Sequence, residues 1–255
     1  MKKDLKKVVI LVPCRNEAEG VARVLRALPH DRAERIGLTL HPIVIDNNST
    51  DFTADVARAM GAEVLYEQDP GKGHAMLHGF ANIPDDADYV VMIDGDDTYD
   101  AGEVLRLVEP IESGFADVVI GSRLAGRIER DAMSFTNRAG NWMFSFLVRS
   151  VYRANVTDVL TGYYAWSRSA LMRLRPHITV RDFGIEMDMV TKMARLDEAI
   201  YCVPIRYTSR TGTSHLRPFV DGFRILRVFF RNIVWRPVAV PSSAEPNDQY
   251  AVVTR

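Results

Sequence analysis

Hydrophobic and polar positions alternate along the first half of the chain in a pattern that predicts strands separated by helices. Short runs rich in Val and Ile are followed by stretches with helical periodicity. The predicted strands are "KVVILVP", "HPIVID", "AEVLYE", "DYVVMID" and "ADVVIGS", and the predicted helices cover residues 17–28, 53–60, 72–82 and 101–113. Strands of this kind, separated by helices of about 10–15 residues, are typical of βαβ units. The pattern therefore predicts an α/β fold with a mostly parallel central sheet flanked by helices.

The second half has a less regular pattern. Helices are predicted over 137–152 and around "IEMDMVTKMARL", a strand within "TGYYAWSRSALMRL", another in "IYCVPIRYTSR", and a last helix over 219–235. One face of that last helix holds Phe219, Phe223, Leu226, Phe230 and Ile233, and another holds Arg224, Arg227 and Arg231. The segment from Pro237 onward is rich in Pro, Ser and polar residues, which predicts a flexible tail.

Length and composition describe a globular chain. With 255 residues, 47% hydrophobic and 25% charged, it can bury a core and fits one large α/β domain. Cys14 and Cys202 are too few for a disulfide framework, which favours a reducing cytoplasm. The apolar run before Pro13 is short for a signal peptide, and no run approaches the roughly 18 residues that span a bilayer. We therefore expect a cytoplasmic protein, peripheral on the cytoplasmic face of the membrane if it meets lipid.

Charge is distributed unevenly between the two halves. Residues 1–122 carry 22 acidic and 12 basic side chains, whereas residues 123–255 carry 11 acidic and 20 basic ones. Residues 205–236 contain seven arginines and a single acid, Asp221. This separation predicts that the halves face different partners, and the basic segment suits a phosphate or an anionic membrane surface.

The stretch "VVMIDGDDTYD" places Asp94, Asp96, Asp97 and Asp100 directly after an apolar run. Carboxylates at such spacing raise one another's pKa and destabilise the fold unless a cation lies among them. Mg²⁺ and Mn²⁺ take oxygen ligands and are often shared with the phosphates of a substrate. Asp94-Gly95-Asp96 can therefore hold a divalent cation on a nucleotide diphosphate; an acidic loop at a helix start is the alternative.

Polar side chains follow other predicted strands. Arg15, Asn16 and Glu17 come after the first strand and Asp46 after the second, and Lys72 lies in a Gly-rich turn. Asn16 and Glu17 also suit simple helix capping, and the turn around Lys72 lacks the form of a P-loop, which disfavours an ATPase. Ligands of open α/β sheets bind beyond the carboxyl ends of the strands, so these residues predict one crevice.

Five motifs in order strengthen this interpretation. Pro-x-Arg-Asn-Glu, "VIDNNSTDFTADVA", "GKGHAMLHG", "VVMIDGDDTYD" and "DVVIGSR" resemble the nucleotide-sugar half of family-2 glycosyltransferases over residues 8–123. The resemblance implies the Rossmann-like GT-A fold, a UDP- or GDP-sugar donor, and Mg²⁺ or Mn²⁺ held by Asp94 and Asp96. The nucleotide-sugar site that it implies consists of Pro13, Arg15, Asn16, Glu17, Asp46, Lys72, Asp94, Gly95 and Asp96. Asn47 stands where relatives usually have a second Asp, which leaves the choice between the two bases open.

The motifs of the second half resemble those of the polyprenyl-phosphate branch, the dolichyl-phosphate mannose and glucose synthases and their prokaryotic relatives. They are "GSRLAG", "NRAGNWMFSFL", "TDVLTGYYAWSRSAL", "DFGIEMDM" and "VPIRYTSRTGTSHLRPFVDGFRIL". The resemblance implies that Thr161, Gly162 and Tyr163 lie near the sugar. It also implies an acceptor-phosphate site of Arg123, Arg138, Arg210, Ser214 and His215, and a catalytic set of Asp96, Arg123, Arg138, Glu186 and Arg210. His215 stands where many relatives carry Lys, and an incidental surface histidine is the alternative.

A lipid phosphate as acceptor agrees with the chemistry of the basic segment. A phosphate monoester has a second pKa of about 6 and is ionised near neutral pH, so it can attack an anomeric carbon without a general base. The helices at 137–152 and 219–235 are then predicted to be interfacial, although burial in the core or in a dimer is an alternative. Trp142 and Trp235, near Arg149 and Arg236, favour the membrane interface.

The sequence thus predicts an inverting transfer of a hexose from a UDP- or GDP-sugar to a polyprenyl phosphate such as dolichyl or undecaprenyl phosphate. We expect a GT-A domain over 1–216, divided into a nucleotide-sugar half (8–123) and an acceptor half (124–216). A basic amphipathic helix (217–236) and a flexible tail (237–255) follow. One rival is transfer to a soluble hydroxyl, which needs Glu186 or Asp182 as a base. The other is a nucleotide-binding, membrane-docking protein without turnover. An anchoring partner or a homo-oligomer is also open, and nothing suggests nucleic-acid binding.

Overall fold

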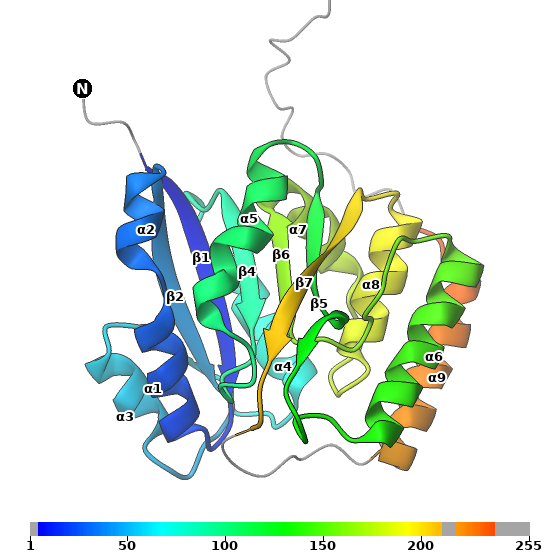
Figure 1. Cartoon of the computed structure of the whole chain (residues 1–255), viewed down its shortest axis with the longest axis horizontal. Coiled ribbons are helices and arrows are strands. Elements are labelled where there is room, and N and C mark those ends of the chain that lie inside the picture. The colour runs from blue at the N-terminus through cyan, green and yellow to red at the C-terminus, as the bar shows by residue number, and fades with distance from the viewer. Residues whose placement is uncertain (1–4, 211–217, 238–255) are drawn as a thin grey trace, which may run out of the picture.

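A seven-stranded sheet forms the centre of the computed structural model, which describes residues 5–210 and 218–237 (Figure 1). The strands lie in the order β3-β2-β1-β4-β6-β5-β7. Their bounds are β1 (Lys6–Cys14), β2 (Leu38–Asp46), β3 (Glu63–Tyr66), β4 (Tyr89–Ile93), β5 (Val118–Ile128), β6 (Tyr163–Ser167) and β7 (Ile200–Tyr207). Only β6 runs antiparallel to its neighbours, β4 and β5. The predicted mostly parallel sheet is confirmed, and strands from both halves of the chain belong to it.

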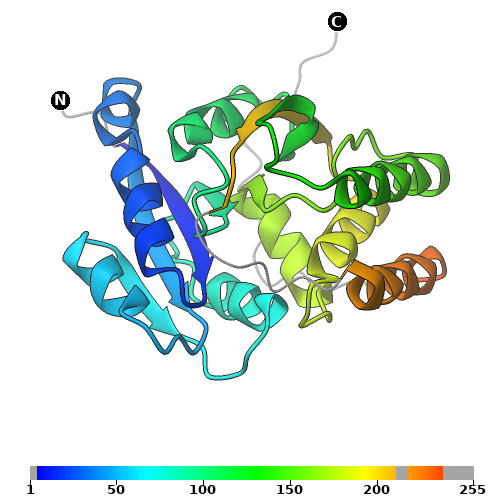
Figure 2. The same ribbon diagram turned by 60° about the horizontal axis from the view of Figure 1, so that its bottom comes forward.

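Helices cover both faces of this sheet (Figures 1 and 2). One face carries α1 (Ala18–Ala27), α2 (His30–Arg35), α3 (Thr53–Ala59) and α5 (Val104–Glu112). The other carries α4 (Lys72–Ala81), α6 (Phe135–Tyr152), α7 (Arg168–Leu174), α8 (Ile185–Arg195) and α9 (Pro218–Ile233). Short 3₁₀ turns at η1 (Ala101–Glu103) and η2 (Arg175–His177) precede α5 and follow α7. The sequence pattern did not predict α2, a six-residue helix in which only Ala33 is buried.

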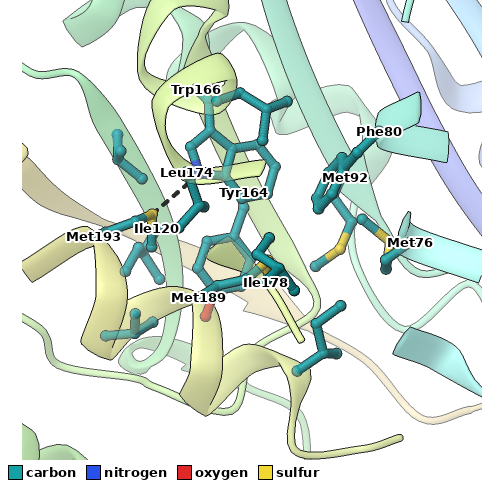
Figure 3. Close-up of a cluster of buried hydrophobic side chains, with 14 of the residues drawn as sticks. Met76, Phe80, Met92, Ile120, Tyr164, Trp166, Leu174, Ile178, Met189 and Met193 are labelled. Atoms are coloured by element: carbon teal, nitrogen blue, oxygen red, sulfur yellow. Dashed lines mark hydrogen bonds between the residues drawn. The ribbon is translucent and has the colours of Figure 1, made fainter. Parts of the chain in front are cut away.

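Two apolar cores, one on each face, explain why the strands are continuous apolar runs. In β1, Val8 and Ile10 point into the core beneath α1 and α5, while Val9 and Leu11 point into the opposite one. A strand covered on both faces has no solvated side and so shows no alternation with polar residues. Figure 3 shows the core on the face that carries α4 and α8, where the Trp166 indole donates to the Met193 sulfur at 3.2 Å.

The last helix, α9, is more deeply integrated than its sequence pattern suggests. Its buried positions are Asp221, Ile225, Val228, Phe229 and Asn232, which pack toward α8. Phe223 and Phe230, from the predicted apolar face, are instead 72% and 59% exposed. Arg231, expected on an outer basic face, donates to the buried Asp188 carboxylate at 2.9 Å. The helix therefore has a buried face with polar members and a separate exposed face with aromatic ones, which corrects the single apolar face expected.

The residues expected as membrane anchors also differ in their exposure. Trp142 is 59% exposed on α6 and stacks on Phe146 with ring centroids 5.8 Å apart. Trp235 is half-buried instead, with its ring edge-on to His177 and the ammonium of Lys192 over its face. Arg149 donates to the Val156 carbonyl at 3.1 Å. Trp142 is thus presented at the surface, while Trp235 and Arg149 take part in packing.

Some expectations concern residues outside those that the structure describes. They are the site roles of Ser214 and His215, the position of the Phe219 side chain, and the tail from Val238 onward. Within the described part of the chain, every helix is either too short or too polar to cross a bilayer.

Candidate active site at the carboxyl edge of the sheet

A cavity of about 640 Å³ opens at the carboxyl ends of the parallel strands, at the edge that Figure 2 turns toward the viewer. Most of the predicted site residues line it. They are Pro13, Arg15, Glu17, Lys72, Asp94, Gly95, Asp96, Arg123, Glu186 and Arg210. They lie in or just after β1, β4, β5 and β7 and on α4 and α8, so the topology gathers segments that are far apart in the sequence.

The Asp94-Gly95-Asp96 turn packs directly against the end of β1. A Cβ atom built on Gly95 would lie 2.2 Å from the Cys14 sulfur, and one on Gly20 would lie 2.5 Å from the Gly95 carbonyl oxygen. No side chain fits at either position, because contacts below about 3 Å are repulsive. The two glycines therefore bring the acidic turn close to the start of α1.

Lys72 joins two carboxylates within the cavity. Its ammonium lies 2.7 Å from Asp94 Oδ1 and 2.7 Å from Glu186 Oε1. Burial by itself lowers the pKa of Lys72, but the charges of Asp94 and Glu186 outweigh burial and hold that pKa above its ordinary value. Burial raises the pKa of Asp94, and Lys72 opposes this rise. A permanently charged lysine therefore stabilises this part of the acidic cluster.

Arg210 makes a second bridge between carboxylates. Its guanidinium donates to Glu17 and lies 3.3 Å from Asp96 Oδ2, while Asp96 Oδ1 accepts from the Thr98 hydroxyl at 2.6 Å. Burial raises the pKa of Glu17 despite the hydrogen bond from Arg210. The Arg210 Nε is buried and has no hydrogen-bond partner among the described residues. Arg210 thus offsets the charges of both Glu17 and Asp96.

The carboxylate pair fits a hard divalent cation. Asp94 and Asp96 both line the cavity, and each is neutralised here by the cationic end of a basic side chain. Mg²⁺ and Mn²⁺ prefer oxygen ligands of this kind and are held by one or two carboxylates together with substrate phosphates.

Arg123 has a structural partner that the sequence did not reveal. Its Nε and Nη2 donate to the two oxygens of Asp158, each at 2.9 Å, and Nη2 also donates to the Leu160 carbonyl. Asn141 of α6 donates to the same Asp158 carboxylate. Bidentate pairing of this kind fixes the guanidinium, so Arg123 ties β5 to α6 at the edge of the cavity. Its contact with a phosphate stays a prediction.

Other predicted residues lie beside the cavity without lining it. Asn16 has φ of 54° and accepts from the Thr50 backbone N–H at 2.7 Å, and Asp46 accepts from the Ser49 N–H at 3.3 Å. These two residues brace the loops after β1 and β2. Arg138 is exposed on α6 next to the lining residue Asn137.

The segment predicted to lie near the sugar is mostly buried. Thr161 donates to the Gly121 carbonyl at 2.8 Å, and Tyr163 belongs to β6 in the core. Gly162 alone approaches the site, since a Cβ built on it would lie 2.0 Å from Asp94 Oδ2. Its N–H donates to the Tyr99 hydroxyl at 2.7 Å.

The hydrogen bonds of Asn47 explain why the chain has Asn at this position, where relatives usually have Asp. Its carboxamide oxygen accepts from the Gly71 N–H at 2.7 Å, while its amide nitrogen donates to the carbonyls of Asp69 at 2.6 Å and Glu67 at 3.3 Å. An ionised Asp could accept from Gly71 but could not donate to two carbonyls. Asn47 therefore fixes the loop that carries Lys72 into the site.

Sequence reasoning missed several lining residues. They are Tyr99, Asn141, Phe144, Phe183, Tyr207, Asp221, Gly222 and Ile225. The last three belong to α9, whose place beside the site depends on tertiary packing with α8 that no local pattern records.

Comparison with known proteins agrees with this geometry. Residues 9–175 match the model of glycosyl transferase family 2. The chain is 32% identical to Glycosyltransferase AglJ of Haloferax volcanii, over 88% of this chain and 71% of the relative. It is also 32% identical to a dolichyl-phosphate hexose transferase of the same organism, over 82% of this chain and 86% of that protein.

A solved structure shares the fold. Glucosyl-3-phosphoglycerate synthase from Mycobacterium tuberculosis, in complex with Mn²⁺, UDP and phosphoglyceric acid, superposes with a TM-score of 0.67 at 22% identity. The match covers 93% of this chain and 80% of the synthase, which supports the GT-A fold. Family match, relatives and fold agree, and the chain belongs to glycosyl transferase family 2 as a glycosyltransferase.

Proposed function

We propose that this glycosyltransferase moves a hexose, with inversion, from a UDP- or GDP-sugar to a polyprenyl phosphate. The observation that carries the proposal is the cavity that brings the Asp94 and Asp96 carboxylates together with the Arg210 guanidinium, whose Nη1 lies 3.3 Å from Asp96 Oδ2. Carboxylates can hold a metal on a diphosphate, and a guanidinium can bind an anionic ligand such as a phosphate. Similarity to a dolichyl-phosphate hexose transferase supports a lipid phosphate as that ligand.

In this proposal Asp94 and Asp96 hold Mg²⁺ or Mn²⁺, which would neutralise the charge of the leaving diphosphate. Lys72 keeps the Asp94 carboxylate in place through its 2.7 Å contact. Arg210, which lines the cavity, binds phosphate oxygens through its guanidinium. The acceptor phosphate is already ionised near neutral pH, and it needs only to be positioned in line with the anomeric carbon.

The state of Glu186 favours a phosphate acceptor over a hydroxyl. A hydroxyl acceptor must lose its proton to a base during attack. Glu186 is 5% exposed and forms an ion pair with Lys72, so its carboxylate is already engaged. Asp182 also lines the cavity, but one oxygen accepts from the Gly184 N–H at 2.9 Å. Transfer to a soluble hydroxyl with Asp182 or Glu186 as base is the rival function.

The lipid acceptor requires contact with a membrane, and α6 and α9 offer the surface for it. We call their exposed apolar side chains the aromatic surface: Phe135, Trp142, Met143 and Phe146 on α6, Val220, Phe223 and Phe230 on α9, and Val234 directly after α9. The two helices lie next to each other at one end of the molecule, and Arg138 and Arg227 are exposed on them (Figure 1). Such a surface suits peripheral attachment to the cytoplasmic face of an anionic membrane.

The test of this function uses labelled donors. Purified protein with Mn²⁺ or Mg²⁺ is incubated with a panel of labelled UDP- and GDP-sugars and a polyprenyl phosphate in detergent. We expect one sugar to pass into the organic extract, and we expect EDTA or Asp96→Asn to abolish this transfer. Label that stays in the aqueous phase with every donor, while a soluble acceptor becomes labelled, would overturn the lipid acceptor.

A further inference from the structure

The cavity has a second wall whose character differs from that of the charged cluster. The N-terminal halves of α6 and α9 form it, together with adjacent loops, and its apolar members are Met133, Phe144, Leu160, Phe183 and Ile225. Figures 1 and 2 show that both helices begin at the carboxyl edge of the sheet, where the charged cluster lies. The cavity therefore joins a polar end suited to phosphates with an apolar region between two helices.

Two glycines keep this second wall open. Gly140 of α6 and Gly222 of α9 both line the cavity, and a Cβ built on either would meet no atom within 4 Å. By contrast, a Cβ on Gly73 of α4 would lie 2.3 Å from the backbone of Arg181, so packing demands that glycine. Glycine inside a helix costs about 0.5–1 kcal/mol relative to alanine. Packing among the described residues does not require Gly140 or Gly222, and their open positions face the cavity.

We propose that this apolar region, named here the α6–α9 groove, binds the isoprene units next to the phosphate of the acceptor. The groove consists of Gly140, Phe144, Leu160, Gly222 and Ile225. The inference rests on the proposed function and adds to it the site that recognises the hydrocarbon.

The charge of Arg224 and the apolar surface that continues from the groove support isoprene units as its ligand. Arg224 lines the same cavity from α9, where it pairs with Asp221 at 3.3 Å and keeps 54% of its side chain exposed. The outward sides of the same helices carry the aromatic surface, including Trp142 and Phe223. A lipid phosphate would thus bury its anion near the arginines, place its first isoprene units between the helices, and leave its remaining chain at the apolar exterior. Burial of hydrocarbon contributes about 25 cal/mol per Å².

The groove can be filled without disturbing the fold. Gly140→Leu and Gly222→Leu add side chains into open space and raise helix propensity, so both variants should fold with unchanged or higher Tm. Ala139→Leu is the matched control, because it adds a leucine to an exposed position one residue before Gly140. Gly140→Ala serves as a milder variant should either leucine substitution fail to fold.

The readout is binding of a probe series, measured by calorimetry with nucleotide diphosphate and Mn²⁺ present: inorganic phosphate, geranyl phosphate and farnesyl phosphate. We expect the wild-type protein and Ala139→Leu to bind the prenyl phosphates at least about tenfold more tightly than inorganic phosphate. The two Gly→Leu variants should lose this preference while nucleotide diphosphate binds with wild-type affinity.

Two results would overturn the proposal that the α6–α9 groove binds isoprene units. If both Gly→Leu variants keep the full prenyl preference, the hydrocarbon lies elsewhere, although lipid-dependent transfer by the wild type would still stand. If the wild type binds prenyl phosphates and inorganic phosphate equally tightly, the groove does not bind isoprene units. Transfer of sugar to a long polyprenyl phosphate is then the separate measurement that decides whether the proposed function is also wrong.

Discussion

Four carboxylates, those of Glu17, Asp94, Asp96 and Glu186, crowd the carboxyl edge of β1 and β4. Lys72 lies between Asp94 and Glu186, and Arg210 joins Glu17 to Asp96. Each basic side chain offsets a repulsion that would otherwise destabilise the folded chain. The four carboxylates outnumber the two basic side chains, so the cluster keeps a negative charge that a divalent cation would offset.

Gly162→Ala tests how closely the Asp94 carboxylate is positioned. The new Cβ would lie 2.0 Å from Asp94 Oδ2, which is the mobile end of a side chain. We expect the carboxylate to move aside, so that Tm changes little while transfer activity falls at least about tenfold. Steady-state kinetics and thermal unfolding of the same preparation would measure both. Ala59→Ser, at an exposed position of α3, is the control substitution; wild-type activity in Gly162→Ala would contradict the expectation.

Binding of Mn²⁺ should depend on pH in a direction set by Asp94 and Glu17. Burial raises the pKa of both carboxyls, so the folded protein binds their protons more readily than the unfolded chain does. Without metal, these groups therefore lower stability as pH rises through the interval between the ordinary and the raised pKa. Because Mn²⁺ needs ionised ligands, its stabilisation should be present above the raised pKa and disappear as pH falls through it.

Thermal unfolding with and without Mn²⁺, at about pH 7.5 and about pH 5, checks this expectation. The increase in Tm should be larger at the higher pH and absent in a variant carrying Asp94→Asn and Asp96→Asn. An equal increase at both pH values would mean that Asp94 is not a ligand with a raised pKa.

Residues at the strand ends were predictable from the sequence, whereas their partners from distant segments were not. Motif order predicted Asp94, Asp96 and Lys72 at one crevice, and all three line the cavity, because strand ends in a parallel sheet converge. The Asp158 partner of Arg123 and the loop-bracing role of Asn47 could not be predicted. Both depend on contacts between segments far apart in the chain, which residue types alone do not specify.

At the scale of elements, α9 shows how a helix with exposed aromatic residues is attached to the catalytic body. The Asp188 carboxylate of α8 is fully buried and accepts from Lys192, Arg231 and Asn232. It also accepts from the backbone N–H groups of residues 179 and 180. Burial by itself raises the pKa of Asp188, but these donors more than compensate and hold it below its ordinary value. The network fixes α9 against α8, two residues from Glu186.

Asp188→Ala should therefore destabilise the protein strongly. It leaves the buried ammonium of Lys192 without its carboxylate, and breaking a buried pair costs about 3–5 kcal/mol. The free energy of unfolding in urea measures the loss. Asp85→Ala, which removes only a surface pair with Arg168, should cost about 0–1 kcal/mol. Similar losses in the two variants would show that the network does not anchor α9.

Periodicity predicted most elements because each strand and helix has to bury an apolar stripe. It did not identify the buried face of α9, for a physical reason. Asp221 and Asn232 are polar and buried, while Phe223 is apolar and exposed, so the hydrophobic pattern no longer marks the core side. Such exceptions occur where a polar network or an external surface replaces ordinary packing.

In the folded molecule, the acidic and the basic half of the chain contribute to different regions. The acidic first half supplies Glu17, Asp94 and Asp96, and the basic second half supplies α6 and α9 with their arginines. One sheet joins the halves, so the charged end of the cavity and the aromatic surface belong to a single body (Figure 1). A soluble donor and a membrane-bound acceptor could then meet in one cavity.

Vesicle binding tests the aromatic surface. We expect the protein to sediment with vesicles that contain phosphatidylglycerol, less with neutral vesicles, and less at high salt. Phe223→Glu and Trp142→Glu should each reduce the bound fraction several-fold, because both residues are exposed on this surface. Phe115→Glu is the matched control, since Phe115 is 67% exposed and lies in the loop between α5 and β5. Equal effects at all three positions would exclude this surface as the docking site.

The most direct test of the central claim compares a polyprenyl phosphate with the corresponding polyprenol as acceptor, using the donor sugar that the panel selects. If the lipid phosphate is the nucleophile, nucleotide diphosphate release will require the phosphate, and the product will be a glycosyl phosphodiester by mass spectrometry. The neutral alcohol will support no release, and Asp96→Asn will remain inactive with both. Release that is equal with the alcohol, or that needs no lipid at all, would contradict the account and return attention to a hydroxyl acceptor with Glu186 or Asp182 as its base.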